Sequence, residues 1–220
     1  MLTGEEQDAF LKSAERVRQT AEGHLRACQN KQSVISFVAN LQRGASYVVQ
    51  TAIDQGVTIA CQAGCSYCCH ARVEAIPPEI FRITKELTSR STPELNRLVQ
   101  RLHIHVVAPS RLNTWSQSPE CPFLENNLCA IYDVRPCACR KAHSLEVQQC
   151  QINAPEIPQD LGVVVKIEAL VRGSSDAYRG LGLDAAGYEL GSAVLMALED
   201  PSMESRWLGG ESVFAADVPE

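Results

Sequence analysis

The sequence predicts a mostly α-helical protein, an irregular helical domain built around a cysteine-rich metal-binding centre. Apolar residues recur at helical spacing toward both ends of the chain, which is typical of helices that bury one face. Nine of the ten cysteines lie between Cys61 and Cys150, and only Cys28 lies outside this stretch. With 220 residues the chain can bury a sizeable core, so we expect residues 1–220 to form a single domain.

The N-terminal part, residues 1–57, is predicted to form helices that frame this centre. Apolar side chains follow one another at helical spacing through residues 5–54. Asn30 and Ser33 are typical of a break and a restart, so we expect two helices, the second of which ends near Gly56.

Further helices are expected after the first cysteines. Pro77-Pro78 and Thr92-Pro93 each open a helix, because proline in the first turn sacrifices no hydrogen bond. Residues 160–208 are again helical, with Val163–Val165 as a candidate short strand. Between these parts, prolines divide residues 109–158 into loop with single turns of helix. We expect a metal to stabilise this segment in place of hydrophobic packing.

The net charge of −6 is concentrated near the C-terminus, where residues 151–220 carry four basic and twelve acidic side chains. A nucleic-acid partner is therefore not predicted, because duplex binding needs a basic face. No run approaches the roughly 20 apolar residues of a membrane span. The acidic start also lacks the basic-then-apolar order of a secretory signal. We therefore expect a cytoplasmic protein without a membrane partner.

The clustered cysteines fall in two main blocks whose spacing suits metal binding. Disulfides are rare in a reducing compartment, so a cysteine cluster there indicates a metal. In the first block, tight spacings let neighbouring thiolates turn toward one ion or cluster, and Gly64 allows the chain to bend. The second block supplies thiols from several turns. The first block contains Cys61, Cys65, Cys68 and Cys69, and the second contains Cys121, Cys129, Cys137 and Cys139.

The residues of the two blocks follow one another in the order C-x3-C-x2-C-C, then C-P-F-L, then C-x-I-Y-x-x-R-P-x-x-C-R. This order resembles the YkgJ-type cysteine-cluster family, whose members are described as zinc- or iron-chelating domains. The resemblance covers residues 58–143 and implies that this stretch is a metal-binding core. Flagellin lysine N-methylases are similar in their cysteine pattern, which implies that the pattern also serves enzymes. The metal ligands that the resemblance implies are Cys61, Cys65, Cys68, Cys69, Cys121, Cys129 and Cys139.

The number of donors favours an iron–sulfur cluster over zinc. One tetrahedral Zn²⁺ takes four ligands, although two zinc ions that share thiolates could use every matching cysteine. A [4Fe–4S] cluster takes three or four, and the others could close a second centre or serve as reactive thiols. Arg135 and Arg140 are expected to support the bound group, because cations offset the charge of clustered thiolates. Whether Cys137, Cys150, His70 and His143 are ligands stays open.

Three functions are open at this point. In the first, the chain is a metal-binding protein without catalysis, whose centre is structural or serves metal handling. The many thiols suggest this function, as does the absence of a recognisable nucleophile–base pair, phosphate loop or nucleotide fingerprint. A methylase-like, iron–sulfur-dependent enzyme that modifies proteins would need an open coordination position and a pocket near Cys65–His70 and Arg135–His143. In a thiol redox sensor, either the adjacent Cys68 and Cys69 or the pair Cys137 and Cys139 would oxidise. A protein partner or substrate is compatible with these functions, and the sequence identifies neither.

Overall fold

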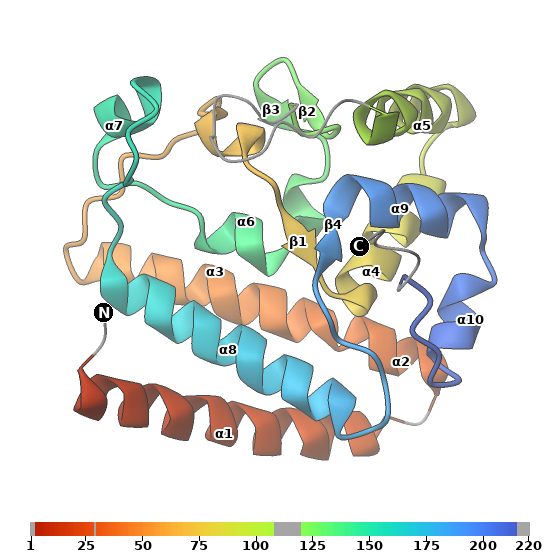
Figure 1. The fold of residues 1–220 in the computed structure, drawn as a ribbon, viewed down its shortest axis with the longest axis horizontal. Coiled ribbons are helices and arrows are strands. Elements are labelled where there is room, and N and C mark those ends of the chain that lie inside the picture. The colour runs from red at the N-terminus through yellow and green to blue at the C-terminus, as the bar shows by residue number, and fades with distance from the viewer. Residues whose placement is uncertain (1–2, 29, 108–119, 215–220) are drawn as a thin grey trace.

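The computed structural model describes residues 3–28, 30–107 and 120–214. Helices dominate it, which confirms the predicted mostly α-helical class (Figure 1). The longer helices are α1 (Gly4–Arg26), α3 (Val38–Asp54), α4 (Pro77–Thr88), α5 (Thr92–Val107), α8 (Leu161–Arg179) and α9 (Leu190–Glu199). The shorter ones are α2 (Lys31–Ser36), α6 (Cys137–Lys141), α7 (Val147–Gln151) and α10 (Met203–Trp207), with the 3-10 turns η1 (Tyr67–His70) and η3 (Tyr132–Val134). The loop predicted over 109–119 lies outside the described residues.

The helices α1, α3 and α8 pack together on one side of the molecule (Figure 1). A capping box starts α1, in which Glu6 N–H donates to Thr3 Oγ1 (3.3 Å) and Thr3 N–H donates to the Glu6 carboxylate (2.8 Å). Farther along, α1 approaches α8 so closely that a Cβ on Gly173 would lie 2.4 Å from Ala14 O. Glycine at this position therefore sets the distance between the two helices.

Two expectations for these helices are wrong. Residues 5–54 form three helices rather than two, because the chain tightens at Phe37, where Asn40 N–H donates to Phe37 O (2.8 Å), and this turn separates α2 from α3. Val163–Val165 are helical rather than extended. The reason is that the Asp160 carboxylate accepts a hydrogen bond from the Val163 N–H (2.8 Å) and so caps the start of α8.

Aromatic rings fill the core where α4, α8 and α10 meet. The ring centroids of Phe81 and Trp207 are 5.6 Å apart, and those of Tyr178 and Trp207 are 5.9 Å apart. The indole N–H of buried Trp207 donates to Asp184 O (2.8 Å), which satisfies its polar atom. Apolar residues of α1, α3 and the cysteine-rich segment belong to the same hydrophobic cluster.

Two pairs of very short antiparallel strands complete the fold. β1 (Glu74–Ala75) pairs with β4 (Tyr188–Glu189) and links the starts of α4 and α9. β2 (Leu124–Glu125) and β3 (Leu128–Cys129) form a hairpin within the cysteine-rich segment. Its turn residues, Asn126 and Asn127, have φ values of 50° and 61°, a left-handed conformation that asparagine tolerates well.

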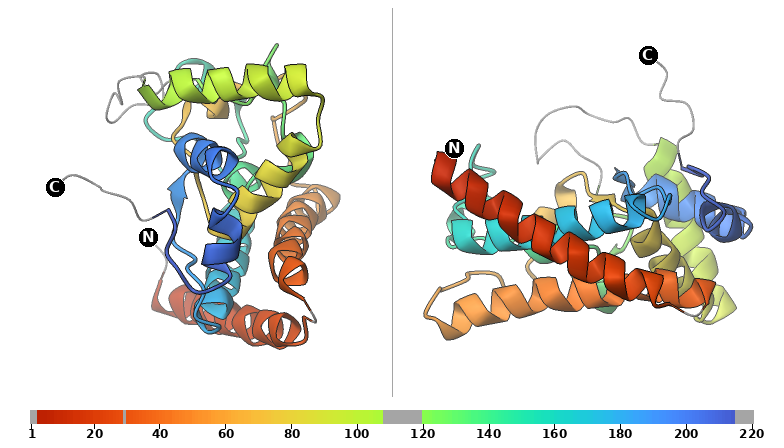
Figure 2. Two further views of the ribbon diagram at one scale, coloured as in Figure 1. Left: turned by 90° about the vertical axis from the view of Figure 1, so that its right-hand side faces the viewer. Right: turned by 90° about the horizontal axis from the view of Figure 1, so that it is seen from below.

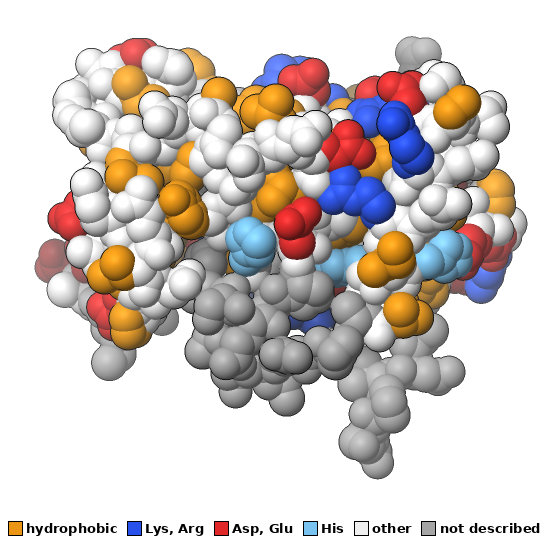
Figure 3. Space-filling view, turned by 90° about the horizontal axis from the view of Figure 1, so that it is seen from above, with side chains coloured by type: hydrophobic (Ala, Val, Ile, Leu, Met, Phe, Trp, Pro, Cys, Tyr) orange, Lys and Arg blue, Asp and Glu red, His pale blue; other side chains and the backbone are white. Residues whose placement is uncertain are grey.

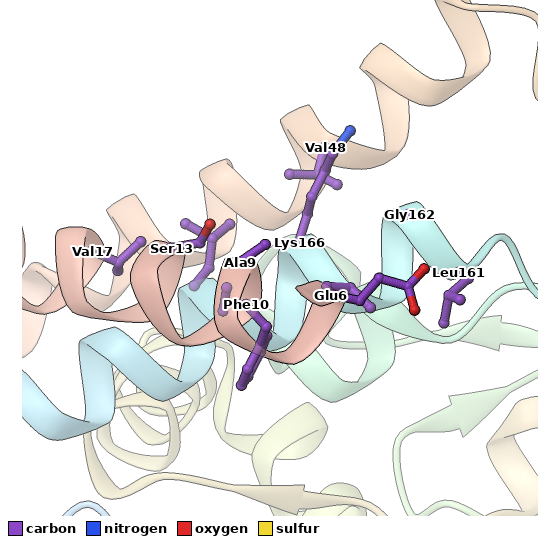
Figure 4. A pocket seen from close by; sticks show the side chains of 12 residues that line it. Glu6, Ala9, Phe10, Ser13, Val17, Val48, Leu161, Gly162 and Lys166 are labelled. Carbon is purple, nitrogen blue, oxygen red and sulfur yellow. The ribbon is translucent and has the colours of Figure 1, made fainter. Parts of the chain in front are cut away.

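The cysteine-rich segment lies on the side of the molecule away from α1 (Figures 1 and 2). An open groove of about 500 Å³ lies elsewhere, between α1, α3 and α8, and its lining is mainly apolar, with Glu6 and Lys166 among it (Figure 4). In the part of the chain that the structure describes, no helix combines the length and the apolar character that crossing a bilayer requires.

Candidate metal centre

Short elements and loops carry the clustered cysteines. All ten cysteines of the chain are free thiols. The predicted bend at Gly64 is present, since this residue has a φ of 86°. Cys61 and Cys65 lie in the loop after α3, Cys68 and Cys69 in η1, Cys121 before β2, Cys129 in β3, Cys137 and Cys139 in α6, and Cys150 in α7.

Hydrogen bonds bring the two cysteine blocks together. Cys121 N–H donates to Cys69 O (2.8 Å), which binds the hairpin segment to η1. Beside this bond, the Ser66 hydroxyl donates to Asn127 Oδ1 (3.3 Å). Residues that are far apart in the sequence therefore lie side by side, as a shared site requires.

Thiols from both blocks influence one another's protonation. Burial raises the pKa of Cys139, and the charges of Cys121, Cys68 and Cys129 raise it further. Burial raises the pKa of Cys121 to about 11, and Cys129 adds a smaller part. A hydrogen bond with Cys69, followed by burial, raises the pKa of Cys68. Because each thiolate would repel the others, this group favours the protonated state unless a cation lies among the sulfurs.

Arg135 lies beside these thiols. Its guanidinium carbon is 3.6 Å from the centroid of the Tyr132 ring, a cation–π contact that fixes the side chain. Burial raises the pKa of Cys129, and the Arg135 charge acts in the opposite direction on both Cys129 and Cys68. The guanidinium is thus placed to favour the thiolate form of two predicted ligands.

Arg140 instead supports the backbone that carries the second block. Its guanidinium donates to Arg135 O (3.0 Å), Asp133 O (2.7 Å) and Ser46 Oγ (2.8 Å). These bonds fasten the turn between η3 and α6 to α3. The positive charge of Arg140 also acts to lower the pKa of Cys129, against the larger effect of burial.

The donor chemistry of this segment suits zinc or iron, because thiolates are the usual ligands of structural zinc and of iron–sulfur clusters. Among the described residues, however, no group of three or more His, Cys, Asp or Glu side chains is arranged to hold a metal ion. The sulfur atoms would have to move closer together to coordinate one. Metal binding would therefore be coupled to local ordering of the loops and short helices.

A cavity of about 130 Å³ lies at one edge of the segment. Its lining includes the thiol-bearing residues Cys61, Cys65, Cys68 and Cys150. Burial raises the pKa of Cys61, whereas a hydrogen bond from Ser144 N–H to its sulfur (3.3 Å) acts in the opposite direction. Figure 3 shows this side of the molecule, where the region over α7 exposes mainly uncharged side chains.

The other candidate ligands have structural partners. Buried His143 accepts a hydrogen bond from Asp160 N–H (2.9 Å) at Nε2, and its Nδ1 lies 2.8 Å from Lys141 O, so both ring nitrogens are engaged. Cys137 is buried, and its backbone N–H donates to Glu79 Oε1 (2.8 Å). His70 is the last residue of η1.

Glu79 of α4 is a neighbour of the site that the sequence does not reveal. Its buried carboxylate accepts hydrogen bonds from Cys137 N–H (2.8 Å), Ile76 N–H (3.4 Å) and the Gln42 amide (3.4 Å). Burial raises the pKa of Glu79, and these bonds oppose the shift. The carboxylate fixes the start of α6, the helix that carries Cys139. In the sequence Glu79 is indistinguishable from an ordinary acidic residue in a first helical turn.

The comparisons with known proteins agree with the cysteine pattern. Residues 60–156 match the model of the CxxCxxCC family, which is described as "Putative zinc- or iron-chelating domain". The matched stretch contains every clustered cysteine, including Cys150, which lies beyond the predicted limits of 58–143. No curated protein and no solved structure matches the chain. Residues 60–156 thus resemble the cysteine domain of this family, which confirms the resemblance that the spacing of the cysteines predicts.

Proposed function

We propose that this chain is a cytoplasmic metal-binding protein, folded as one domain over residues 1–220, that holds its metal through clustered cysteines. The observation that carries the proposal is the hydrogen bond from Cys121 N–H to Cys69 O (2.8 Å), which joins the two cysteine blocks. Around this bond, thiols of both blocks are close enough to raise one another's pKa. The proposed ligands are Cys61, Cys65, Cys68, Cys69, Cys121, Cys129 and Cys139.

The proposed bound group is an iron–sulfur cluster, of the [4Fe–4S] type, with zinc as the alternative. Chelation of either metal agrees with the family description. Seven thiols exceed the four that one zinc ion uses, whereas a cluster with additional thiols nearby accommodates them. When bound, the group would supply the positive charge that lowers the thiol pKa values, and Arg135 and Arg140 would add to this effect.

A cytoplasmic location is consistent with the state of the cysteines. Ten free thiols in one chain would be oxidised or paired in an oxidising compartment, whereas the cytoplasm keeps thiols reduced. The helices in residues 1–57 and 160–208 would then hold the cysteine loops in place of disulfides.

Two observations favour metal holding over the alternative functions. The cavity beside Cys65 and Cys68 has a volume of about 130 Å³, whereas small-molecule sites usually measure about 300–1,000 Å³. It has little room for a substrate beside a metal group, which counts against a protein-modifying enzyme. A redox sensor needs a thiol of low pKa, but the pKa of Cys68 is raised by its hydrogen bond with Cys69 and by burial.

Anaerobic purification tests the proposal, with a visible absorption spectrum and assays for iron, zinc and acid-labile sulfide. A broad band near about 400 nm with matching iron and sulfide would establish an iron–sulfur centre. A colourless protein with stoichiometric zinc would establish the alternative. A folded protein that binds neither metal would contradict the proposal.

The Cys68→Ser variant, with Cys28→Ser as its matched control, tests the assignment of ligands. Cys68 lies outside the hydrophobic core that the structure describes, so the substitution leaves no cavity there. Cys28 lies outside the cysteine blocks, with its thiol directed to His24 O (3.5 Å). We expect Cys68→Ser to lose metal and Cys28→Ser to retain all of it, while circular dichroism shows both chains folded. Equal metal content in the two variants would contradict the role of Cys68.

A further inference from the structure

The groove between α1, α3 and α8 has no role in the function proposed above. Its volume of about 500 Å³ lies within the range of about 300–1,000 Å³ that is usual for small-molecule sites. The helix α8 packs against both α1 and α3, so it lies between the two walls of the groove (Figures 1 and 4). None of the described residues that line the groove is a cysteine, so it is separate from the candidate metal centre.

Two close helix contacts close the groove at one end. A Cβ on Gly173 of α8 would lie 2.4 Å from Ala14 O of α1, and a Cβ on Gly44 of α3 would lie 3.4 Å from Leu170 Cδ1 of α8. Both walls are therefore drawn onto α8 near this end. Toward the start of α8 the groove stays open, because Gly162 lines it without a side chain to fill the space.

Apolar side chains line the groove without being fully buried. Phe10 of α1, Val48 of α3 and Val165 of α8 are only half-buried, and Leu161 at the start of α8 is 57% exposed. Burial of one methylene group strengthens binding about fourfold. An apolar chain that covers these side chains would therefore gain affinity with each methylene group that enters the groove.

Lys166 adds a positive charge to this apolar lining. Lys141 is paired with Glu168, whereas among the residues that the structure describes no carboxylate lies within ion-pair distance of the Lys166 ammonium. The Lys166 side chain extends toward Val48, away from the Glu6 carboxylate (Figure 4). Glu6 Oε2 already accepts hydrogen bonds from the Thr3 N–H (2.8 Å) and hydroxyl (3.0 Å). The groove therefore complements an apolar molecule that carries a negative charge.

The dimensions of the groove favour a single acyl chain over a helix of another protein. One helical turn, with a pitch of about 5.4 Å and a diameter of about 11 Å, occupies about 500 Å³. The groove thus has room for about one turn, whereas a helix that docks in a groove uses anchors over two turns. From Leu161 to Leu170 the helix α8 rises by about 14 Å, at 1.5 Å for each of nine steps. A fully extended chain of medium length matches that distance.

We propose that this groove binds the free anion of a medium-chain fatty acid. The carboxylate pairs with the Lys166 ammonium, and the acyl chain covers the apolar side chains of α1 and α8, among them Phe10 and Val165. The inference does not depend on metal binding, because the groove shares no lining residue with the cavity at Cys61 and Cys68.

Isothermal titration calorimetry of the full chain with dodecanoate tests the proposal at about pH 8, where the carboxylate and the lysine are both charged. We expect one site per chain, and decanoate should bind about 15-fold more weakly because it lacks two methylene groups. Dodecyltrimethylammonium has the same chain with a positive head, and it should bind at least about 10-fold more weakly than dodecanoate because Lys166 repels it.

Lys166→Gln, with Lys12→Gln as its matched control, tests the role of the charge. Lys12 is an exposed residue of α1 that does not line the groove. We expect Lys166→Gln to weaken dodecanoate binding about 10-fold, while Lys12→Gln binds like the wild type. Ala9→Phe adds a ring to the α1 wall of the groove and should weaken binding by at least as much. Circular dichroism establishes that each variant is folded.

Four results would overturn the inference. The first is an absence of dodecanoate binding, and the second is equal affinity of Lys166→Gln and Lys12→Gln. The third is equal affinity for dodecyltrimethylammonium, which would mean unspecific apolar binding. The fourth is a dimer in analytical ultracentrifugation that dodecanoate does not dissociate and Ala9→Phe does, which would assign the groove to a second copy of the chain. Elemental analysis of the same samples measures the bound metal separately, so none of these results bears on the proposed function.

Discussion

Substitution of Gly173 by alanine tests whether the close approach of α1 and α8 holds the framing helices together. A Cβ on Gly173 would lie 2.4 Å from Ala14 O, 2.6 Å from Val17 Cβ and 2.8 Å from Val17 Cγ1, whereas ordinary Cβ contacts are at 3.4 Å or more. The nearest of these atoms belongs to the backbone and cannot be moved by a change of rotamer. The two helices would therefore have to separate by about 1 Å along their contact, as the difference between 3.4 and 2.4 Å requires.

The expected loss of stability follows from two opposing effects. Alanine is favoured over glycine in a helix interior by about 1 kcal/mol. Overpacking of a close contact costs about 1–3 kcal/mol and sometimes more, and a backbone clash belongs at the upper end of that range. We therefore expect Gly173→Ala to lower the free energy of unfolding by about 2 kcal/mol. For a chain of this size, that corresponds to a fall in Tm of about 4–8 °C.

Gly23→Ala is the matched control, since Gly23 lies in α1 and an added Cβ would have no neighbour within 4 Å. It should raise the free energy of unfolding by about 0.5–1 kcal/mol, because only the helix propensity changes. Urea denaturation followed by circular dichroism measures both variants and the wild type. Equal stability of the two variants would refute the reasoning, because it would mean that the glycine does not set the helix separation.

Three further predictions concern charged side chains. Glu79→Ala removes the acceptor of Cys137 N–H (2.8 Å) and should lower the free energy of unfolding by about 3 kcal/mol, since buried donors lose their partner. Glu79→Gln retains a carbonyl oxygen and should lose less stability. If urea denaturation showed the same loss for both variants, the role of this bond would be contradicted. Arg135→Ala should weaken metal binding about 10-fold in competition with a chelator, whereas Arg172→Ala, in an exposed ion pair with Asp176, should not. The pair of His105 Nε2 and Glu189 Oε1 (3.2 Å) should stabilise the fold most between about pH 4.5 and 6.5. The hydrogen bond with Glu189 raises the pKa of His105, so the contribution of His105 is present below its unfolded pKa of about 6.5 and is lost as the pH rises through the folded value. Burial would raise the pKa of Glu189, but hydrogen bonds from His105, Ser192 and Gly191 lower it to about 2, so its contribution is lost only as the pH falls toward that value. The free energy of unfolding of His105→Gln should approach that of the wild type above pH 7. If the difference between them did not shrink there, the coupling of His105 with Glu189 would be contradicted.

The helices could be predicted from the sequence because their signals are local. The apolar spacing over residues 5–54, the prolines at Pro77-Pro78 and the threonine before Pro93 each specify an element within a few residues. The turn at Phe37 could not be predicted in this way, because it depends on a single hydrogen bond from Asn40 N–H to Phe37 O (2.8 Å) within an otherwise continuous apolar pattern. The pairing of β1 with β4 could not be predicted either, since a strand of two residues has no periodicity to detect.

For the site, residue types could be predicted but their grouping could not. Spacing identifies the cysteines as donors, since thiols at intervals of two or three residues can turn toward one point. Which thiols share a space depends on contacts between distant segments, such as the bond from Cys121 N–H to Cys69 O. Cys150 adds no close spacing of its own, and only the packing of α7 against η1 brings it to the cavity. Glu79 is similar, because its partner Cys137 is far away in the sequence.

The protonation of the thiols connects this arrangement to metal binding. Burial raises the pKa of Cys121 to about 11, and the same effect raises the pKa of Cys61, Cys129 and Cys139. Without a cation the fold therefore holds these groups as neutral thiols, and this avoids buried charge. A metal ion must displace those protons, so its affinity should increase with pH while the protein itself gains little from ionising the thiols. A metal ion would bring the sulfurs together as thiolates, so the order of the loops should depend on metal binding, whereas the helices around them are stabilised by their own hydrophobic core.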